Sequence, residues 1–258
     1  MEYIVITINE QGVALLELNR PRILNVLNAQ LMEEMSCALR ELADDESVRA
    51  LIVTGRGRGF CAGADLSHVS TDNAAGQTLG QAISRQMRDY FNPLMVLLYE
   101  FPRPVVSALN GIAAGGGAGI ALCADIVLAS SDASLKVVQV PKLGIVADLG
   151  VNWLLPRLGG RSRALGACLT GKAIDASQLL EWGLVWECIE AASLLERAHA
   201  LAAELALLPP DTVIATRQLI DSAYDSNFVA ALEAERVHQE KLCDAPVFNE
   251  SVQRFLAR

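Results

Sequence analysis

Two glycine-rich segments and one aspartate carry the residue types that could do chemistry in this sequence. The first segment, residues 104–125, contains three consecutive glycines at 115–117, and we expect a buried strand to break at Asn110-Gly111 before a helix of small residues. Glycines let another group approach the backbone closely, and the first N–H groups of a helix have no partner within it. This arrangement favours a site for negative charge, although the same glycines also suit close packing in a core helix.

Residues 55–66 form the second segment, and glycine is so frequent there that we expect an irregular loop. The segment follows a predicted buried strand at 50–54, and ligand-binding loops usually leave the carboxyl ends of strands in α/β folds. Its glycine spacing matches neither of the common nucleotide-phosphate motifs, so the spacing does not indicate a nucleotide site. Cys61 lies in this loop without an evident histidine partner, so we do not expect covalent catalysis.

Asp148 is the third chemical candidate. It immediately precedes a predicted helix that runs through Leu155, and aspartate is a preferred N-cap, so the spacing alone favours capping. A carboxylate in apolar surroundings can instead act as a proton-transferring base, because burial raises its pKa. The neighbouring Val140, Ile145 and Trp153 would supply such surroundings.

Strands and helices that alternate along the chain must position these segments. The apolar patterns predict strands at 3–9 and 13–18 that form a hairpin, a helix from Asn28, a long helix ending near residue 100, and strands at 125–129 and 135–140. From Asp148 onward the pattern is mostly helical. We therefore predict an α/β protein with a core at 1–190 and a helical region at 191–258.

The composition of the chain excludes several classes of partner. Of its 258 residues, 52% are hydrophobic, yet no apolar run reaches the ~18 residues that a membrane span needs. The net charge is -9 without a cluster of basic residues, which argues against a nucleic-acid partner. Six dispersed cysteines without paired spacing give no support for a metal site and indicate a reducing compartment. We see no signal-peptide pattern and expect a cytoplasmic location.

The two glycine-rich segments together carry a family resemblance. Residues 59–66, followed by 110–125, resemble the enoyl-CoA hydratase/isomerase family, which is the crotonase superfamily. Further similar stretches extend over nearly the whole chain and include residues 19–25, 143–144, 154–157 and 176–185. The resemblance implies a crotonase-like core of repeated ββα turns. It also implies C-terminal helices that build a homotrimer or a dimer of trimers, and the high apolar content fits such subunit contacts.

The resemblance also implies where the substrate binds. The family holds the thioester carbonyl of an acyl-CoA between two backbone N–H groups, which correspond to Ala64 and Gly116. Removing a proton beside a thioester puts negative charge on that oxygen, and two fixed donors stabilise the enolate. Coenzyme A is part of the substrate, so no separate cofactor is expected. Matching positions imply substrate contacts from Arg22, Ile23, Leu24, Ala62, Asp65, Leu66, Gly115, Val140, Phe255 and Arg258.

The type of reaction depends on which acids are present. Family hydratases carry two glutamates, and this sequence has Gly119 and Val140 at those positions. Adding water needs both a positioned oxygen nucleophile and a proton donor, so simple hydration is disfavoured. Some family isomerases, including those that act on dienoyl-CoA or on a ring epoxide, carry an aspartate at the position of Asp148. This similarity shifts our interpretation of Asp148 from capping to catalysis. For Asp65 and Asp125 we favour structural roles.

We therefore expect an acyl-CoA isomerase that shifts a double bond or rearranges a ring epoxide, with Asp148 as the proton shuttle. One base can move a proton within an allyl system without adding water. Three alternatives stay open: an enoyl-CoA hydratase with atypical residues, a non-catalytic acyl-CoA-binding homologue, and a dehalogenase that uses the aspartate as a nucleophile.

Overall fold

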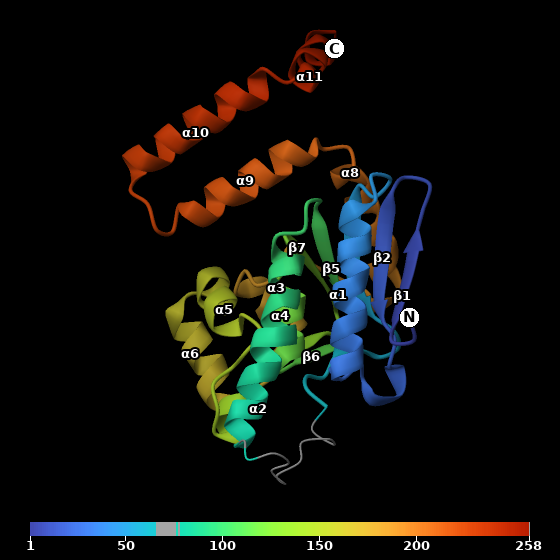
Figure 1. The fold of residues 1–258 in the computed structure, drawn as a ribbon, viewed down its shortest axis with the longest axis vertical. Coiled ribbons are helices and arrows are strands. Elements are labelled where there is room, and N and C mark those ends of the chain that lie inside the picture. The colour runs from blue at the N-terminus through green and yellow to red at the C-terminus, as the bar shows by residue number, and fades with distance from the viewer. Residues whose placement is uncertain (66–75, 77, 258) are drawn as a thin grey trace.

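The strands of this chain divide between two sheets, as the computed structural model shows for residues 1–65, 76 and 78–257 (Figure 1). The strands are β1 (Ile4–Ile8), β2 (Val13–Leu18), β3 (Ala50–Gly55), β4 (Gly59–Cys61), β5 (Val105–Leu109), β6 (Ile112–Ala114), β7 (Ile126–Ser130), β8 (Ser134–Lys136), β9 (Ile174–Asp175) and β10 (Glu187–Ile189). The larger sheet has the order β1-β2-β3-β5-β7-β10, and the smaller sheet has the order β4-β6-β8-β9.

Helices follow these strands and form most of the C-terminal part. The α-helices are α1 (Ala29–Asp44), α2 (Leu79–Gln86), α3 (Asn92–Tyr99), α4 (Gly116–Leu122), α5 (Val151–Gly159), α6 (Arg161–Thr170), α7 (Ala176–Glu181), α8 (Leu194–Leu205), α9 (Pro210–Ser222), α10 (Phe228–Cys243) and α11 (Pro246–Leu256). Shorter 3₁₀ or π-helical turns are η1 (Pro21–Ile23), η4 (Met87–Phe91), η5 (Gln139–Leu143) and η6 (Ala191–Ser193). None of the helices within the described ranges is long and apolar enough to cross a lipid bilayer.

The order of these elements confirms the predicted ββα repeat. Strands β3, β5 and β7 of the larger sheet are each followed by a strand of the smaller sheet and then by a helix. The strands β1 and β2 form the predicted antiparallel hairpin, and the other neighbours in the larger sheet pair in parallel. The predicted helix from Asn28 is α1, and the Asn28 side chain caps it by accepting a hydrogen bond from Leu31 N at 2.9 Å.

The larger sheet is apolar because helices cover both of its faces. Side chains alternate between the faces of a strand, so Leu51 and Val53 of β3 enter the core that contains residues of α1 and α3. Ala50 and Ile52 point the other way and pack with residues of α8. This double burial explains why β3 and β5 are buried along their whole length and lack an alternating polar face.

Two sequence expectations were wrong in detail at the glycine segments. The expected irregular loop at 55–66 contains β4, and the strand β6 lies between Asn110-Gly111 and helix α4. Gly111 lies so close to the backbone near Arg58 that a Cβ there would be 3.0 Å from the Arg58 carbonyl carbon. The glycines therefore allow the short strands to pair closely, and they do not prevent regular structure. The strand expected at 135–140 ends at Lys136 and is followed by the π-helical turn η5.

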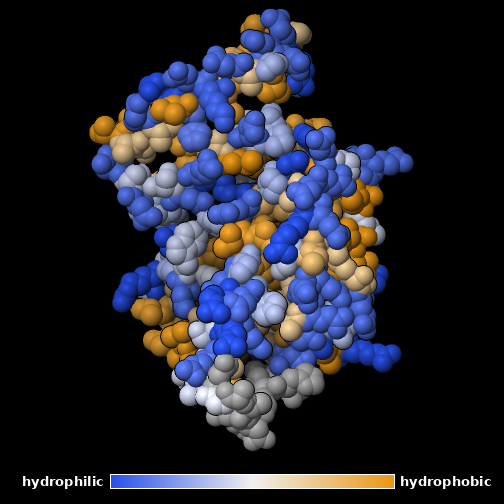
Figure 2. All heavy atoms as spheres, in the orientation of Figure 1, coloured by the Kyte–Doolittle hydropathy of each residue, from blue (hydrophilic) through white to orange (hydrophobic). Residues whose placement is uncertain are grey.

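The C-terminal helices differ in how they meet the rest of the chain. Arg217 on α9 binds both carboxylate oxygens of Asp125 at 2.8 and 2.7 Å, and Asp125 also accepts from Val105 N. Helices α10 and α11 have no buried residues in this chain and extend away from the sheets (Figure 1). Figure 2 shows apolar side chains interrupting the hydrophilic surface over these helices. The boundary at residue 190 and the trimer stay predictions.

Candidate active site

The segments that contain Ala64 and Gly116 lie side by side. Strands β4 and β6 pair in parallel and place Cys61 opposite Ala113. Ala64 and Gly116 follow this pair at equal spacing along the two chain segments. The structure therefore brings together the two backbone positions that the sequence predicted to act jointly.

The N–H groups of Ala64 and Gly116 have no hydrogen-bond partner in the described part of the chain. Gly116 is the first residue of α4, whose first N–H groups lie outside the helical hydrogen-bond ladder. Gly115 precedes it with φ 54° and ψ -124°, a backbone conformation that favours glycine. A Cβ on Gly115 would lie 3.7 Å from the Cα of Gly63, so the two loops pass each other closely. Two adjacent donors are therefore available to an oxyanion.

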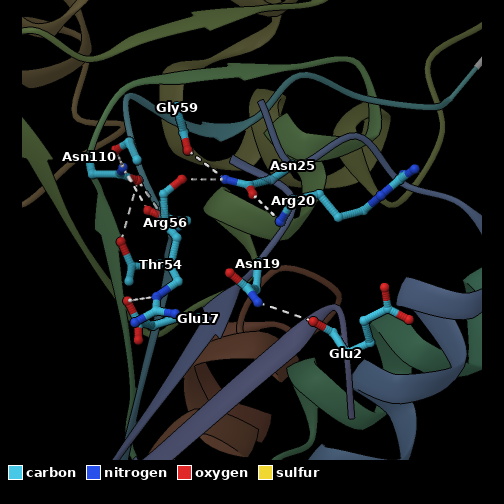
Figure 3. A network of polar contacts seen from close by, with 11 residues as sticks. Glu2, Glu17, Asn19, Arg20, Asn25, Thr54, Arg56, Gly59 and Asn110 are labelled. Atoms are coloured by element: carbon cyan, nitrogen blue, oxygen red, sulfur yellow. Dashed lines mark hydrogen bonds and ion pairs between the residues drawn. The ribbon is translucent and has the colours of Figure 1, made fainter. Parts of the chain in front are cut away.

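Two asparagine side chains hold the backbone of the turn that enters this region (Figure 3). Asn25 is fully buried, donates to Gly59 O at 2.8 Å and accepts from Arg20 N at 2.8 Å. Asn110 donates to Gly55 O at 2.7 Å. Sequence patterns identified Asn110 only as a strand break and gave no role to the Asn25 amide. A buried polar side chain is hydrogen-bonded in most proteins. Here the carbonyl groups that accept from Asn25 and Asn110, those of Gly59 and Gly55, lie 34 and 55 residues away in sequence.

The predicted coenzyme A contacts Arg22, Ile23 and Leu24 lie next to the second glycine loop. Ala62 N donates to Leu24 O at 2.9 Å, which places the two segments in register. Arg22 and Ile23 are exposed on η1, where a ligand can reach them. Four of the predicted contacts therefore share one surface.

Other predicted contacts are placed differently. Asp65 accepts from Arg20 at 3.1 Å in an ion pair whose side chains are each 11% exposed, which supports the structural role. Phe255 lies on α11, at the end of the molecule opposite α2 and β6 (Figure 1). One chain therefore does not bring Phe255 to the other site residues. Leu66 and Arg258 lie outside the described residues.

Asp148 lies half-buried after η5 and receives a hydrogen bond from a side chain that sequence reasoning missed. Gln139 Nε2 donates to Asp148 Oδ1 at 3.0 Å. Burial raises the pKa of Asp148 above its ordinary value, while the hydrogen bond from Gln139 acts in the opposite direction. Helix α5 has Gly150 as its N-cap without a side-chain cap, so capping by Asp148 was wrong.

The predicted apolar surroundings of Asp148 are only partly in place. Ile145 is 50% exposed, and Val140 is half-buried on η5. The ring of Trp153 packs edge-on against Tyr99, with 5.6 Å between centroids, and the Arg157 guanidinium lies 3.7 Å from the Trp153 ring centroid. The raised pKa of Asp148 is therefore a consequence of its overall burial.

Leu149, the residue after Asp148, packs against helix α4. A Cβ on Gly119 would lie 2.9 Å from both the carbonyl carbon and the Cβ of Leu149. A Cβ on Gly116 would lie 2.5 Å from Leu149 Cδ1. Leu149 therefore packs along both glycines, which places the turn that contains Asp148 beside the start of α4.

The buried thiol of Cys61 is unsuited to nucleophilic attack. Cys61 is fully buried, and burial raises its pKa to about 12. The reactive thiolate is therefore scarce at neutral pH.

Comparisons with known proteins identify relatives of this chain. The enoyl-CoA hydratase/isomerase family model matches residues 8–258. The 1,2-epoxyphenylacetyl-CoA isomerase of Escherichia coli (strain K12) is 38% identical, covering 100% of this chain and 97% of that protein. A Rhodobacter capsulatus protein named "Probable enoyl-CoA hydratase" is 34% identical, covering 96% and 93% of the two chains.

Solved structures give the same result for the fold. A crystal structure of an enoyl-CoA hydratase from Bacillus anthracis superposes with a TM-score of 0.89 at 30% identity. The match covers 99% of this chain and 96% of that chain. The chain therefore belongs to the enoyl-CoA hydratase/isomerase family, the crotonase superfamily.

Proposed function

We propose that this enzyme is an acyl-CoA isomerase in which Asp148 moves a proton within the acyl group. The observation that carries the proposal is the contact of Leu149 with Gly116 and Gly119. This contact places the turn that contains Asp148 against the start of α4 and leaves no room for a side chain at position 119. Asp148 then serves as the one acid of the proposed reaction, which suits isomerisation better than hydration.

The proposed reaction is a double-bond shift in an enoyl-CoA thioester. The Asp148 carboxylate accepts a proton from the carbon beside the double bond, and the electrons move onto the thioester oxygen as an enolate. The N–H groups of Ala64 and Gly116 stabilise this charge without reorganisation. Asp148 then returns the proton to another carbon of the same allyl system, so no atom is gained or lost. A carboxylate with a raised pKa is a stronger base for the first step.

The rearrangement of a ring epoxide is a second candidate within the same site. It is favoured by the 38% identity to the 1,2-epoxyphenylacetyl-CoA isomerase over the full chain.

We assign the acyl-CoA to the surface formed by residues 22–24 and Ala62, and the resemblance adds Asp65 and Leu66 as further contacts. Gly115 and Val140 contact the acyl end, and the substrate itself supplies the coenzyme A. Phe255 and Arg258 reach the ligand from another copy of the chain in a homotrimer or a dimer of trimers. Apolar side chains that α10 leaves exposed support such subunit contacts: Phe228, Val229, Leu232 and Val237.

Product analysis of the purified protein with 3-enoyl-CoA, 2-enoyl-CoA and a ring-epoxide CoA thioester tests the proposal. We expect isomerised product without added water, and we expect Asp148→Asn to bind acyl-CoA but to lose turnover. Full isomerase activity of Asp148→Asn would refute the role of Asp148. A 3-hydroxyacyl-CoA product would support the hydratase, binding without any turnover would support the binding homologue, and chloride release from a chlorobenzoyl-CoA would support the dehalogenase.

A further inference from the structure

The Gln139 amide is buried with only part of its hydrogen-bonding capacity used. Gln139 is 4% exposed, and its Nε2 donates to Asp148 Oδ1 at 3.0 Å. Its Oε1 is buried without a partner in the described part of the chain. Burying an unpaired polar atom is unfavourable, and an apolar side chain could fill this space without that cost. Packing alone therefore does not explain a glutamine at this position.

The position of Gln139 links the two parts of the proposed site. A Cβ on Gly115 would lie 3.6 Å from Gln139 Nε2, so the amide lies beside the residue that precedes Gly116. Within the described ranges, Gln139 is the one side chain that hydrogen-bonds the Asp148 carboxylate. The amide thus lies between the oxyanion-binding loop and the base.

We infer that Gln139 is a positioning residue that holds Asp148 Oδ1 and leaves Oδ2 to exchange the proton with the substrate. This inference rests on the proposed isomerase function. During turnover the proton moves from a substrate carbon to Oδ2 and then to a second substrate carbon, and Gln139 itself gains and loses nothing.

A primary amide suits a base that alternates between two protonation states. Its N–H group donates to Oδ1, an oxygen that can accept both when Asp148 is ionised and when Oδ2 carries the proton. An apolar side chain at position 139 could serve neither state.

Charged neighbours do not account for the behaviour of Asp148. The elements packed around it carry Lys142 on η5, Arg157 on α5, and Arg161 and Arg163 on α6. None of these groups forms an ion pair or hydrogen bond with Asp148 within the described part of the chain. The Gln139 donor therefore opposes burial in setting the pKa of Asp148.

The test compares Gln139→Met and Gln139→Glu with wild type across a pH series, using the enoyl-CoA substrate that wild type isomerises. Both changes raise the pKa of Asp148, because Met removes a donor and Glu adds a second carboxyl group. We expect the acid limb of kcat/KM to move to higher pH in both variants. At the acid end we expect about tenfold lower kcat/KM, with a smaller loss at high pH and little change in KM.

The control variant is Gln178→Met. Gln178 also uses its side chain to bond a neighbour, accepting from Asp175 N at 3.3 Å in the capping box of α7. This variant should lose some thermal stability and keep the wild-type pH profile. If the control profile shifts as far as that of Gln139→Met, the effect is general destabilisation and the inference fails.

Two outcomes separate this inference from the proposed function. An inactive Asp148→Asn together with unchanged pH profiles for both Gln139 variants would overturn the role of Gln139 alone. A fully active Asp148→Asn would overturn the proposed function and this inference with it. If circular dichroism shows that Gln139→Met does not fold, the profile of the near-isosteric Gln139→Glu decides.

Discussion

The carbonyl group of Leu149 lies directly against Gly119, in the space that any side chain at position 119 would occupy. Leu149 reaches this position with a left-handed backbone, at φ 48°, and Gly150 continues at φ 80°. By the family resemblance, a hydratase glutamate would need this same space. The turn before α5 therefore explains both the absence of that carboxylate and the placement of Asp148.

Replacing Gly119 with alanine should destabilise the protein by about 1–3 kcal/mol, because the added methyl group overlaps Leu149. The matched control is Gly166→Ala in α6, where nothing lies within 4 Å of the added Cβ. The control should gain up to about 1 kcal/mol from helix propensity. Chemical denaturation measures both changes, and a stable Gly119→Ala protein would contradict the packing described. Gly119→Glu should not create hydratase activity.

The difference in stability between Asp148→Asn and wild type should depend on pH. The folded pKa of Asp148 is raised, so the folded state binds this proton more tightly than the unfolded state does. Keeping the group ionised therefore costs stability once the pH rises above its ordinary value of about 3.9. We expect Asp148→Asn to melt at a higher temperature than wild type at pH 7. The difference should shrink as the pH falls toward 4, and equal melting temperatures at pH 7 would contradict the effect of burial.

Gly115→Ala should lower turnover because alanine disfavours the backbone angles that orient the Gly116 N–H group. The control is Gly160→Ala, since Gly160 also has a positive φ, at 80°, and has open space around it. Both changes should cost about 1–3 kcal/mol of stability. Only Gly115→Ala should reduce kcat, by about 10²-fold or more. Equal decreases in kcat for the two variants would contradict the assignment of Gly116 to the proposed oxyanion site.

Arg217 should anchor α9 to the core. It donates to Asp125 at 2.7 and 2.8 Å and to Phe101 O at 2.8 Å, so Arg217→Met should cost about 1–3 kcal/mol. Arg236 on α10 makes an ion pair of similar length with Glu233, and both side chains are exposed. Because exposed ion pairs contribute little, Arg236→Met should change stability by at most about 1 kcal/mol. Thermal melting measures the loss of stability in both variants. A larger loss for Arg236→Met would contradict the expectation that the less exposed Arg217 contributes more stability.

The sequence predicted the large elements because periodicity and local turn residues specify them. The hairpin of β1 and β2 and the capped helix α1 were confirmed close to their predicted ends. The short strands β4 and β6 escaped prediction because each depends on pairing with a segment distant in sequence. Such pairing leaves no periodic pattern in three residues.

The glycine-rich segments of the candidate site could be predicted from the sequence. The side chain that hydrogen-bonds Asp148 could not. The resemblance pointed to Ala64, Gly116 and Asp148, and the structure places their segments together. Gln139 was missed because it lies in an apolar run that resembled a strand, where its direction could not be known. The signal available was a single polar residue among valines at 137–140. That signal marks a buried polar group but does not name its partner.

The N–H groups of Ala64 and Gly116 belong to the main chain, and this has an evolutionary consequence. No substitution other than proline deletes a backbone donor, so the proposed contacts to a thioester can persist while the surrounding side chains diverge. Changes at positions such as 140 and 148 can then alter the proposed proton transfer without removing these donors. Under the proposed mechanism, related proteins would share the backbone donors that stabilise the enolate. They would differ in the side chains that decide how the enolate reacts next.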